Sequence, residues 1–143
     1  MADIHKIGLL VVREDTCVLL CRKRHGTSLL ILPGGKTEPD ETPLECLSRE
    51  LREELGGVEA RDEEYVGSYT DVAAGEDTRT VRIELYRGRL TGEPVASAEI
   101  GELVWFGERD DPALLAPSLR NRVFPDLIAR GLLPWNGRWL LLP

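Results

Sequence analysis

The sequence has no apolar run that approaches the roughly 20 residues a helix needs to cross a bilayer. Its first residues, MADIHKIGLLVV, contain no basic segment before their short apolar stretch and no small-residue cleavage site after it. This pattern argues against a secretory signal peptide, and IGLLVV is instead typical of a buried strand. We therefore expect a protein that does not bind membranes.

Cysteine is scarce as well. Cys17, Cys21 and Cys46 are an odd number of cysteines, and their spacing matches no metal site. Cys17 and Cys21 lie four residues apart in a strand-like run, so we expect them to share one face and to pack as small apolar groups. The sequence therefore predicts no disulfide framework, and it indicates a cytoplasmic location in a reducing environment.

Basic residues are fewer than acidic ones. The chain has 18 Lys and Arg residues and 25 Asp and Glu residues, so its formal net charge is −7. Duplex nucleic acid and anionic membranes both require a cationic surface, so we predict no stable binding to nucleic-acid duplexes. An acidic enzyme can still bind a polyphosphate where a divalent metal ion reverses the local charge. We allow for a homodimer.

The composition that remains is typical of a globular protein, with 42% apolar and 30% charged residues in a chain of 143 residues. This length fits one domain, residues 1–143, with a core large enough to fold alone. Strand-like segments on both sides of one helical segment predict an α/β sandwich around a mixed β-sheet. The expected strands cover residues 7–12, 17–22, 28–33, 63–72, 78–90 and 102–106.

Turn signals predict how these segments connect. The sequence REDT suggests that residues 7–12 and 17–22 form a hairpin, and residues 34–43 are rich in turn formers and are expected to be a loop. A late helix within residues 111–133 is expected to break or begin near Pro117 or Pro125. An Asn-Gly pair predicts a second hairpin within residues 133–143.

The strongest helix signal follows the loop. Thr42 and Glu45 form a capping box, Pro43 suits the first helical position, and two glycines at the end of the pattern give a stop signal. Four leucines recur at the spacing of one helical face and are expected to form the buried stripe: Leu44, Leu47, Leu51 and Leu55.

The tripeptide GKT at residues 35–37 is typical of a P-loop, which also requires a glycine five residues before its Gly-Lys. That earlier position is Leu30, and two prolines separate the GKT from the helix. The sequence therefore argues against a P-loop. Gly34 and Gly35 still predict backbone that bends tightly and can approach a ligand or a metal ion closely.

Three carboxylates of the helix, Glu50, Glu53 and Glu54, share an arc of roughly 100° when successive residues are placed 100° apart. This acidic arc borders the leucine stripe, with Glu54 nearest the core. One interpretation is a solvated acidic face. The other is a Mg²⁺ or Mn²⁺ site, because like charges at i,i+3 and i,i+4 and carboxylates near a core both require a balancing cation. The spacing alone leaves both open.

A longer pattern contains these residues. Gly35 is followed after five residues by Glu41 and after seven more by RELREELG, which begins at Arg49. This pattern resembles the Nudix box of the Nudix (MutT-like) hydrolases over residues 35–57. Every fixed position matches up to Gly56, and the sequence departs from the family at Gly57, where an aliphatic residue is usual.

The resemblance implies an α/β/α sandwich in which the box forms a loop, a helix and a second loop. It further implies that Glu50, Glu53 and Glu54 bind Mg²⁺ or Mn²⁺ as metal ligands, with the carbonyl of Gly34 or Gly35 completing the site. An ion pair between Glu41 and Arg49 would link the loop to the helix, and Lys36 would be free to contact phosphate.

The reaction implied by the resemblance is hydrolysis of a nucleoside diphosphate linked to another group. Metal ions would neutralise the pyrophosphate and activate water. We expect Glu53 or Glu50 as the base, Glu54 as the least replaceable ligand, and Arg49 as part of the same catalytic group. The family often recruits a further acid from a later loop. Glu99 and Glu102 are candidates for this metal ligand, although both also fit ordinary loop acids.

Candidate substrate contacts are less specific. Arg22 and Lys23, at the end of a strand, either bind phosphate or are solvated. Asn121 resembles the base-contacting asparagine of MutT-like enzymes, but asparagine is also common at helix starts. Three aromatic residues fit either base stacking or core packing: Trp105, Phe106 and Trp135.

The substrate expected by default is a (d)NTP, cleaved to a nucleoside monophosphate and pyrophosphate. The alternatives are hydrolysis of ADP-ribose or another linked nucleoside diphosphate, and a non-catalytic nucleotide-sensing module on the same scaffold. A sensor could lose a metal carboxylate without losing its fold, and all three helix carboxylates are present here.

Overall fold

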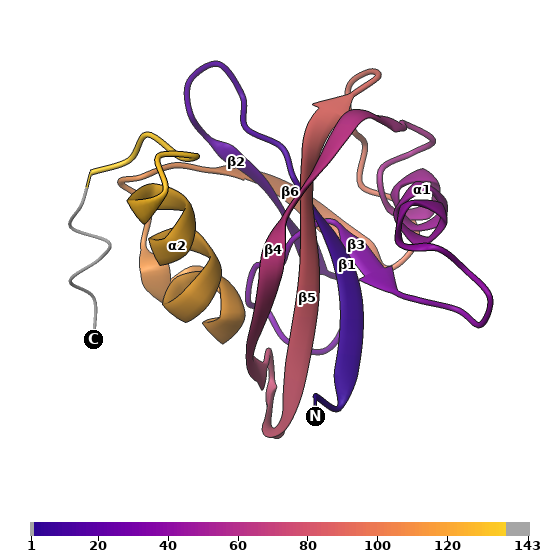
Figure 1. Cartoon of the computed structure of the whole chain (residues 1–143), viewed down its shortest axis with the longest axis horizontal. Coiled ribbons are helices and arrows are strands. Elements are labelled where there is room, and N and C mark those ends of the chain that lie inside the picture. Colours follow the sequence, from indigo (N-terminus) through magenta and orange to yellow (C-terminus); the bar gives the residue numbers. More distant parts are fainter. Residues whose placement is uncertain (1, 137–143) are drawn as a thin grey trace.

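The computed structural model describes residues 2–136. Their elements follow one another along the chain as shown in Figure 1: β1 (Ile4–Leu10), β2 (Val18–Lys23), β3 (Gly34–Lys36), α1 (Pro43–Glu54), β4 (Ala60–Ala73), β5 (Glu76–Leu90), β6 (Ile100–Phe106), the 3₁₀-helix η1 (Pro112–Leu114), the π-helix η2 (Leu119–Val123) and α2 (Phe124–Ala129).

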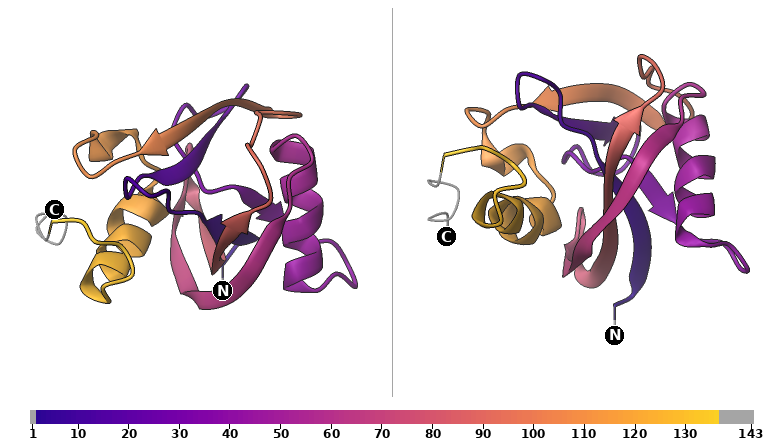
Figure 2. Two further views of the ribbon diagram at one scale, coloured as in Figure 1. Left: turned by 90° about the horizontal axis from the view of Figure 1, so that it is seen from above. Right: turned by 45° about the horizontal axis from the view of Figure 1, so that its top comes forward.

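The main sheet has the strand order β3-β1-β5-β4. It is mixed, because β1 runs parallel to β5 whereas the β1–β3 and β4–β5 pairs are antiparallel. A second sheet consists of β2 and β6. Helices α1 and α2 lie on opposite sides of the strands in every view (Figures 1 and 2). The predicted α/β sandwich around a mixed sheet is confirmed, as is the pairing of residues 63–72 with 78–90.

From Ile7 to Leu10, β1 is buried on both faces, which explains its continuous apolar run. Its successive residues Leu9 and Leu10 pack into two different cores. Leu9 joins the core under α1, with Leu47 and Leu51, while Leu10 joins the core on the α2 side, with Phe124. The strand therefore stands between the two layers of helix.

The hairpin predicted from residues 7–12 and 17–22 is wrong beyond its turn. Val12 and Val18 form an isolated bridge, and the Leu19 N–H donates to the Val11 carbonyl over 3.0 Å. Beyond that point β1 pairs with β3 and β5, while β2 pairs with β6. Two strands that are apolar on both faces do not indicate their partners, so distant segments decided the pairing.

The strand predicted for residues 28–33 is also wrong, because this segment makes only the isolated bridges Cys21–Ile31 and Leu30–Leu115. The strand that forms is β3, which lies in the segment expected to be a loop. Gly34 makes this possible: its φ is +134°, and a Cβ there would lie 2.0 Å from the Ile7 carbonyl oxygen. Only glycine allows the chain to approach β1 so closely.

Helix α1 begins and ends as predicted. Thr42 is the N-cap, and both halves of the capping box with Glu45 are present. The buried stripe differs at one end, because Leu44 is 44% exposed. Leu44 lies in the first turn beside the exposed Glu45, ahead of the point where the helix meets the core through Cys46 and Leu47.

The late helical region is irregular, as its prolines predict. Pro125 is the second residue of α2, and α2 directly follows the π-helix η2. Proline has no N–H and clashes with the carbonyl four residues earlier, so a widened turn accommodates it. Phe124 packs against Phe106 and Trp135, with ring centroids 6.1 and 5.2 Å away. The Asn-Gly hairpin predicted within residues 133–143 falls on residues that lie mostly outside the described range.

None of the helices formed by residues 2–136 combines the length and apolar character that crossing a membrane requires.

Candidate active site

A cavity of about 300 Å³ opens between the main sheet, α1 and the start of the late helical region. Its lining residues are of two chemical kinds, called here the charged half and the apolar half. One half is charged, and its titratable side chains are Lys6, Lys23, Lys36, Glu50, Glu54 and Glu99. The other half is apolar, and its larger side chains are Ile4, Leu32, Val81, Ile83 and Leu119. The cavity is therefore suited to a ligand with one anionic end and one apolar end.

The acidic part of the cavity brings together Glu50, Glu54 and Glu99. Each offers a carboxylate oxygen, and these three oxygens lie within 4.8 Å of one another. Glu50 and Glu54 come from α1, while Glu99 directly precedes β6. Glu53 is exposed and does not line the cavity. Of the two later acids, Glu99 lies at the cavity and Glu102 does not.

Burial governs the chemistry of Glu54, which is 3% exposed. Desolvation raises the pKa of Glu54 to about 8, and the nearby charges of Glu50 and Glu99 add to this effect. The Gly34 N–H opposes it by donating to Glu54 Oε1 over 3.0 Å. Burial also raises the pKa of Glu50, against the pull of Arg49. Both carboxylates would be stabilised as anions by a nearby cation.

Gly35 permits the close approach of the loop to α1. A Cβ on Gly35 would lie 2.4 Å from the carboxyl carbon of Glu50, so any side chain there would displace this carboxylate. The buried Cys46 donates its thiol hydrogen to the Gly35 carbonyl, with Sγ 3.6 Å from the oxygen, and so helps to hold this carbonyl in place. The glycine pair thus holds backbone against the acidic cluster, as the sequence predicts.

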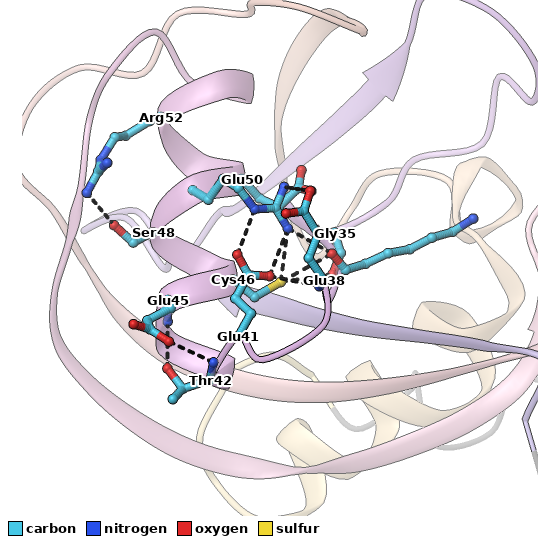
Figure 3. A network of polar contacts seen from close by, with 11 residues as sticks. Gly35, Glu38, Glu41, Thr42, Glu45, Cys46, Ser48, Glu50 and Arg52 are labelled. Carbon is cyan, nitrogen blue, oxygen red and sulfur yellow. Dashed lines mark hydrogen bonds and ion pairs between the residues drawn. The ribbon is translucent and has the colours of Figure 1, made fainter.

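Arg49 ties the loop to the helix. Its Nε and Nη2 donate to the two oxygens of Glu41 over 2.7 and 3.0 Å, and its Nη1 donates to Glu50 Oε1 over 2.8 Å. A further bond of 3.0 Å reaches the Lys36 carbonyl. Figure 3 shows Glu41, Gly35 and Glu50 gathered on one side of α1. The implied Glu41–Arg49 ion pair is present, and the guanidinium lowers the pKa of Glu41 to about 2.

Lysines provide the positive charge of the cavity. Lys6 of β1 lies directly opposite Lys36 of β3 in the antiparallel ladder, and Lys23 is the last residue of β2. The pKa of Lys6 is lowered, first by burial and then by the charges of Lys23 and Lys36. Lys36 lies at the cavity as the sequence predicts.

Two predicted substrate contacts lie elsewhere. Arg22 forms an ion pair with Glu102, and its Nε donates to the Ser28 carbonyl over 3.0 Å. Successive strand residues point to opposite faces, so Lys23 and not Arg22 lines the cavity. Asn121 is exposed, and its Nδ2 donates to Asp71 over 3.1 Å.

The aromatic candidates are not in the cavity lining. Phe106 and Trp135 are buried and pack together with centroids 6.1 Å apart, and Trp135 Nε1 donates to the Thr16 carbonyl over 2.9 Å. Trp105 contacts Arg13, whose guanidinium carbon lies 4.6 Å from the ring centroid. These positions favour core packing and surface contacts over base stacking.

Two cavity residues, Lys6 and Ser118, were missed by sequence reasoning. The signal for Lys6 was a single cation inside an apolar strand, on the same face as Ile4 and Gly8. Ser118 is 3% exposed and lines the apolar half of the cavity, and its side chain does not cap the π-helix that follows. No spacing rule singles out such a serine in advance.

A sequence model described as the NUDIX domain matches residues 5–127. An RNA pyrophosphohydrolase of Halorhodospira halophila is 36% identical over 134 residues, which cover 93% of this chain and 62% of that protein. An NAD-capped RNA hydrolase, NudC, of Pseudomonas entomophila is 33% identical over 125 residues, covering 87% of this chain and 44% of the relative.

A CTP pyrophosphohydrolase of Escherichia coli is 38% identical over 77 residues, covering 52% of this chain and 56% of the relative. The chain thus spans between 44% and 62% of the length of these curated relatives. The solution structure of the E. coli ORF135 protein matches with a TM-score of 0.70 and 29% identity, covering 93% of this chain and 94% of that one.

Proposed function

Because the chain belongs to the Nudix family, we propose that it is a metal-dependent hydrolase that cleaves nucleoside triphosphates to nucleoside monophosphates and pyrophosphate. One observation carries this proposal: a single cavity is lined both by three carboxylates and three lysines and by apolar side chains. A nucleoside polyphosphate has the same division into a charged chain and a largely apolar base.

The donor set of the cavity fits a hard divalent cation. Glu50, Glu54 and Glu99 place carboxylate oxygens within 4.8 Å of one another, and burial disfavours the unpaired anion of Glu54. Mg²⁺ and Mn²⁺ prefer such oxygen ligands. We propose these three side chains as ligands, together with Glu53 and the Gly35 carbonyl. When bound, the ion supplies charge neutralisation for the pyrophosphate and lowers the pKa of water.

Among the helix acids, Glu50 is the proposed general base. Glu50 lines the cavity, whereas Glu53 is exposed. The bond from Arg49 holds Glu50 Oε1 in place, so Glu50 Oε2 is the oxygen to which a proton would move. Arg49 in turn is fixed by both oxygens of Glu41, so its proposed role is to position the base.

Lys36 and Lys23 are the proposed contacts to phosphate, because both line the charged half of the cavity. Leu32, Ile83 and Leu119 form the wall where the nucleoside would bind. Arg22 and Asn121 stay predicted substrate contacts. To contact a ligand, Arg22 would have to release Glu102, and Asn121 would have to release Asp71. The three free thiols agree with the proposed cytoplasmic location.

The alternatives differ in what they require. ADP-ribose and other linked nucleoside diphosphates carry less negative charge than a triphosphate, so three lysines at one cavity favour the triphosphate. A nucleotide sensor could lose a metal carboxylate without losing its fold, and all three helix carboxylates are present here. The names of the relatives add RNA 5′ ends and CTP to the compounds worth testing.

A substrate panel tests the proposal. Purified protein should be incubated with the dNTPs, the NTPs, ADP-ribose, diadenosine polyphosphates and 5′-triphosphorylated RNA, with Mg²⁺, with Mn²⁺ or with EDTA. We expect turnover of nucleoside triphosphates that depends on metal and yields monophosphate and pyrophosphate, separated by ion-exchange chromatography. Tight nucleotide binding without turnover would favour the sensor.

Two neighbouring acids provide a matched control. Glu99→Gln removes a proposed ligand, whereas Glu102→Gln changes an acid three residues later that pairs with Arg22 outside the cavity. We expect Glu99→Gln to lose at least about tenfold in kcat/KM and to need more metal, and Glu102→Gln to stay within about twofold of wild type. Equal effects of the two substitutions would contradict the proposed metal site.

A further inference from the structure

The chain contains only three lysines, Lys6, Lys23 and Lys36, against 15 arginines. All three lysines line the one cavity described above. No arginine within residues 2–136 lines it. The positive charge that faces the cavity therefore comes from lysine alone, although arginine is the commoner cation of the chain by far.

The two kinds of cation also differ in their partners. Most arginines within residues 2–136 form an ion pair with an acid, as in the pairs Arg87–Glu64 and Arg130–Asp126. The ammonium groups of the three lysines have no ion-pair or hydrogen-bond partner within residues 2–136. Unpaired cations that converge on a cavity are what an anionic ligand needs.

Lys6 holds the central position among the three lysines. On one side it lies opposite Lys36 of β3, and on the other it lies opposite Ile83 of β5. Lys6 thus stands where the charged half of the cavity meets the apolar half. Like charges directly opposite each other on paired strands are destabilising, so the Lys6–Lys36 arrangement has no structural benefit by itself.

We propose that Lys6 is a specificity-determining residue that binds the phosphate adjoining the nucleoside, and that Lys6 and Lys36 together select a linear polyphosphate chain. This inference rests on the proposed function, because it takes the nucleoside to lie in the apolar half. A base seated against Ile83 would leave its phosphate chain to pass Lys6 on the way to Lys36 and the carboxylates.

Amine footprinting tests this contact without disturbing the cavity. The protein should carry Arg87→Lys, which introduces an exposed reference amine outside the cavity, and be treated with an acetylating reagent. Acetylation at each position is followed by mass spectrometry, with and without Mg²⁺ and a nucleoside triphosphate analogue whose α- and β-phosphorus atoms are joined by methylene. We expect the analogue to slow acetylation of Lys6 and Lys36 at least about tenfold and to leave position 87 within about twofold.

Protection of Lys36 without protection of Lys6 would overturn the inference. So would equal protection at position 87, because it would show a loss of reagent reactivity unrelated to the cavity. Pyrophosphate in place of the analogue should protect Lys6 less, and equal protection by both ligands would contradict selection of the longer chain.

Substitution adds a functional readout. Lys6→Met removes the charge and keeps the length of the side chain, and Arg87→Met removes one charge at the surface of β5 as the matched control. We expect Lys6→Met to raise KM for the triphosphate at least about tenfold, with kcat within about threefold, and Arg87→Met to change neither by more than about twofold. Circular dichroism confirms that both variants are folded.

Calorimetric binding of the methylene analogue separates this inference from the proposed function. Binding by wild type that is lost in Lys6→Met, without any turnover of the natural triphosphate, would leave the inference standing and refute the enzyme. Turnover that Lys6→Met leaves unchanged would refute the inference alone. Absence of both binding and turnover in wild type would refute both.

Discussion

At the scale of single residues, Glu54 belongs both to the buried interior and to the candidate site. Its carboxylate is almost fully buried, accepts a hydrogen bond from the Gly34 N–H and faces Glu50 and Glu99. A carboxylate in this position is costly to ionise, and its raised pKa of about 8 expresses that cost. Placement of an acid against the core is unfavourable for stability and favourable for cation binding.

The first prediction concerns Glu54→Gln in metal-free protein. The pKa of Glu54 is raised in the folded state, so between its ordinary value of 4.5 and about 8 the folded protein binds more protons than the unfolded chain. The free energy of unfolding of wild type should therefore fall as pH rises through this window, by at most about 1.4 kcal/mol per pH unit from this group. Glu54→Gln should remove that slope, and in the presence of Mg²⁺ it should abolish turnover.

Urea unfolding between pH 5 and pH 8 measures the effect. Glu53→Gln is the control, because Glu53 is an exposed acid on the same helix and its replacement should keep the slope. An identical pH dependence in wild type and Glu54→Gln would show that the buried carboxylate does not carry the linkage.

At the scale of elements, the direction in which Glu50 and Glu54 point depends on where α1 begins and ends, and specific residues set both ends. The capping box of Thr42 and Glu45 starts the helix, and Gly56, with a φ of +72°, lies just beyond its end. The cap also sets where Glu50 and Glu54 fall relative to the loop. The Arg49–Glu41 pair then fixes the loop against the helix that the cap has started.

The second prediction is that Thr42→Ala destabilises the protein by about 1 kcal/mol, since the N–H of Glu45 loses its acceptor at the helix start. Thr42→Ser keeps a hydroxyl acceptor and should stay within a few tenths of a kcal/mol of wild type. Both values come from urea unfolding at one pH. Equal stability of Thr42→Ala and wild type would mean that the capping box does not hold α1.

At the scale of the whole molecule, the cavity exists because two sheets, α1 and the late helical region meet around it. Lys6 and Ile83 come from the main sheet, Lys23 from the second sheet, and Leu119 from η2. The local lysine cluster contrasts with the net charge of −7 of the chain as a whole. The three lysines therefore provide cations at the cavity, while the net negative charge of the chain disfavours polyanions elsewhere. A homodimer stays a prediction for solution light scattering to test.

The third prediction follows from this charge distribution. Duplex DNA should show no retention in a gel-shift assay even at about 50 mM salt, because the net charge of −7 opposes the approach of a polyanion. The methylene analogue should bind in the same buffer with Mg²⁺, which serves as the positive control. A salt-dependent complex with the duplex would contradict the prediction.

The sequence by itself determined the Nudix family, the position of α1, the Glu41–Arg49 pair and the arc that holds Glu50 and Glu54. The family and the Glu41–Arg49 pair follow from the resemblance of residues 35–57 to the Nudix box. The position of α1 and the arc depend on spacings within one helix, where the geometry of successive residues is nearly fixed. The strands that pair as β4 and β5 were predictable for the same reason, because their alternation is local.

Only the tertiary structure decided which distant segments meet. In the structure, β1 and β2 lie in different sheets. Glu99 and Lys23 line the cavity, whereas Glu102 and Arg22 do not, and Lys6 lies opposite Lys36. Each of these outcomes depends on strand partner and register, and a shift by one residue sends a side chain to the other face of a sheet. Local patterns do not specify that register. The helix acids, Lys36 and, beside Arg22, Lys23 could therefore be named from the sequence, but Lys6 could not.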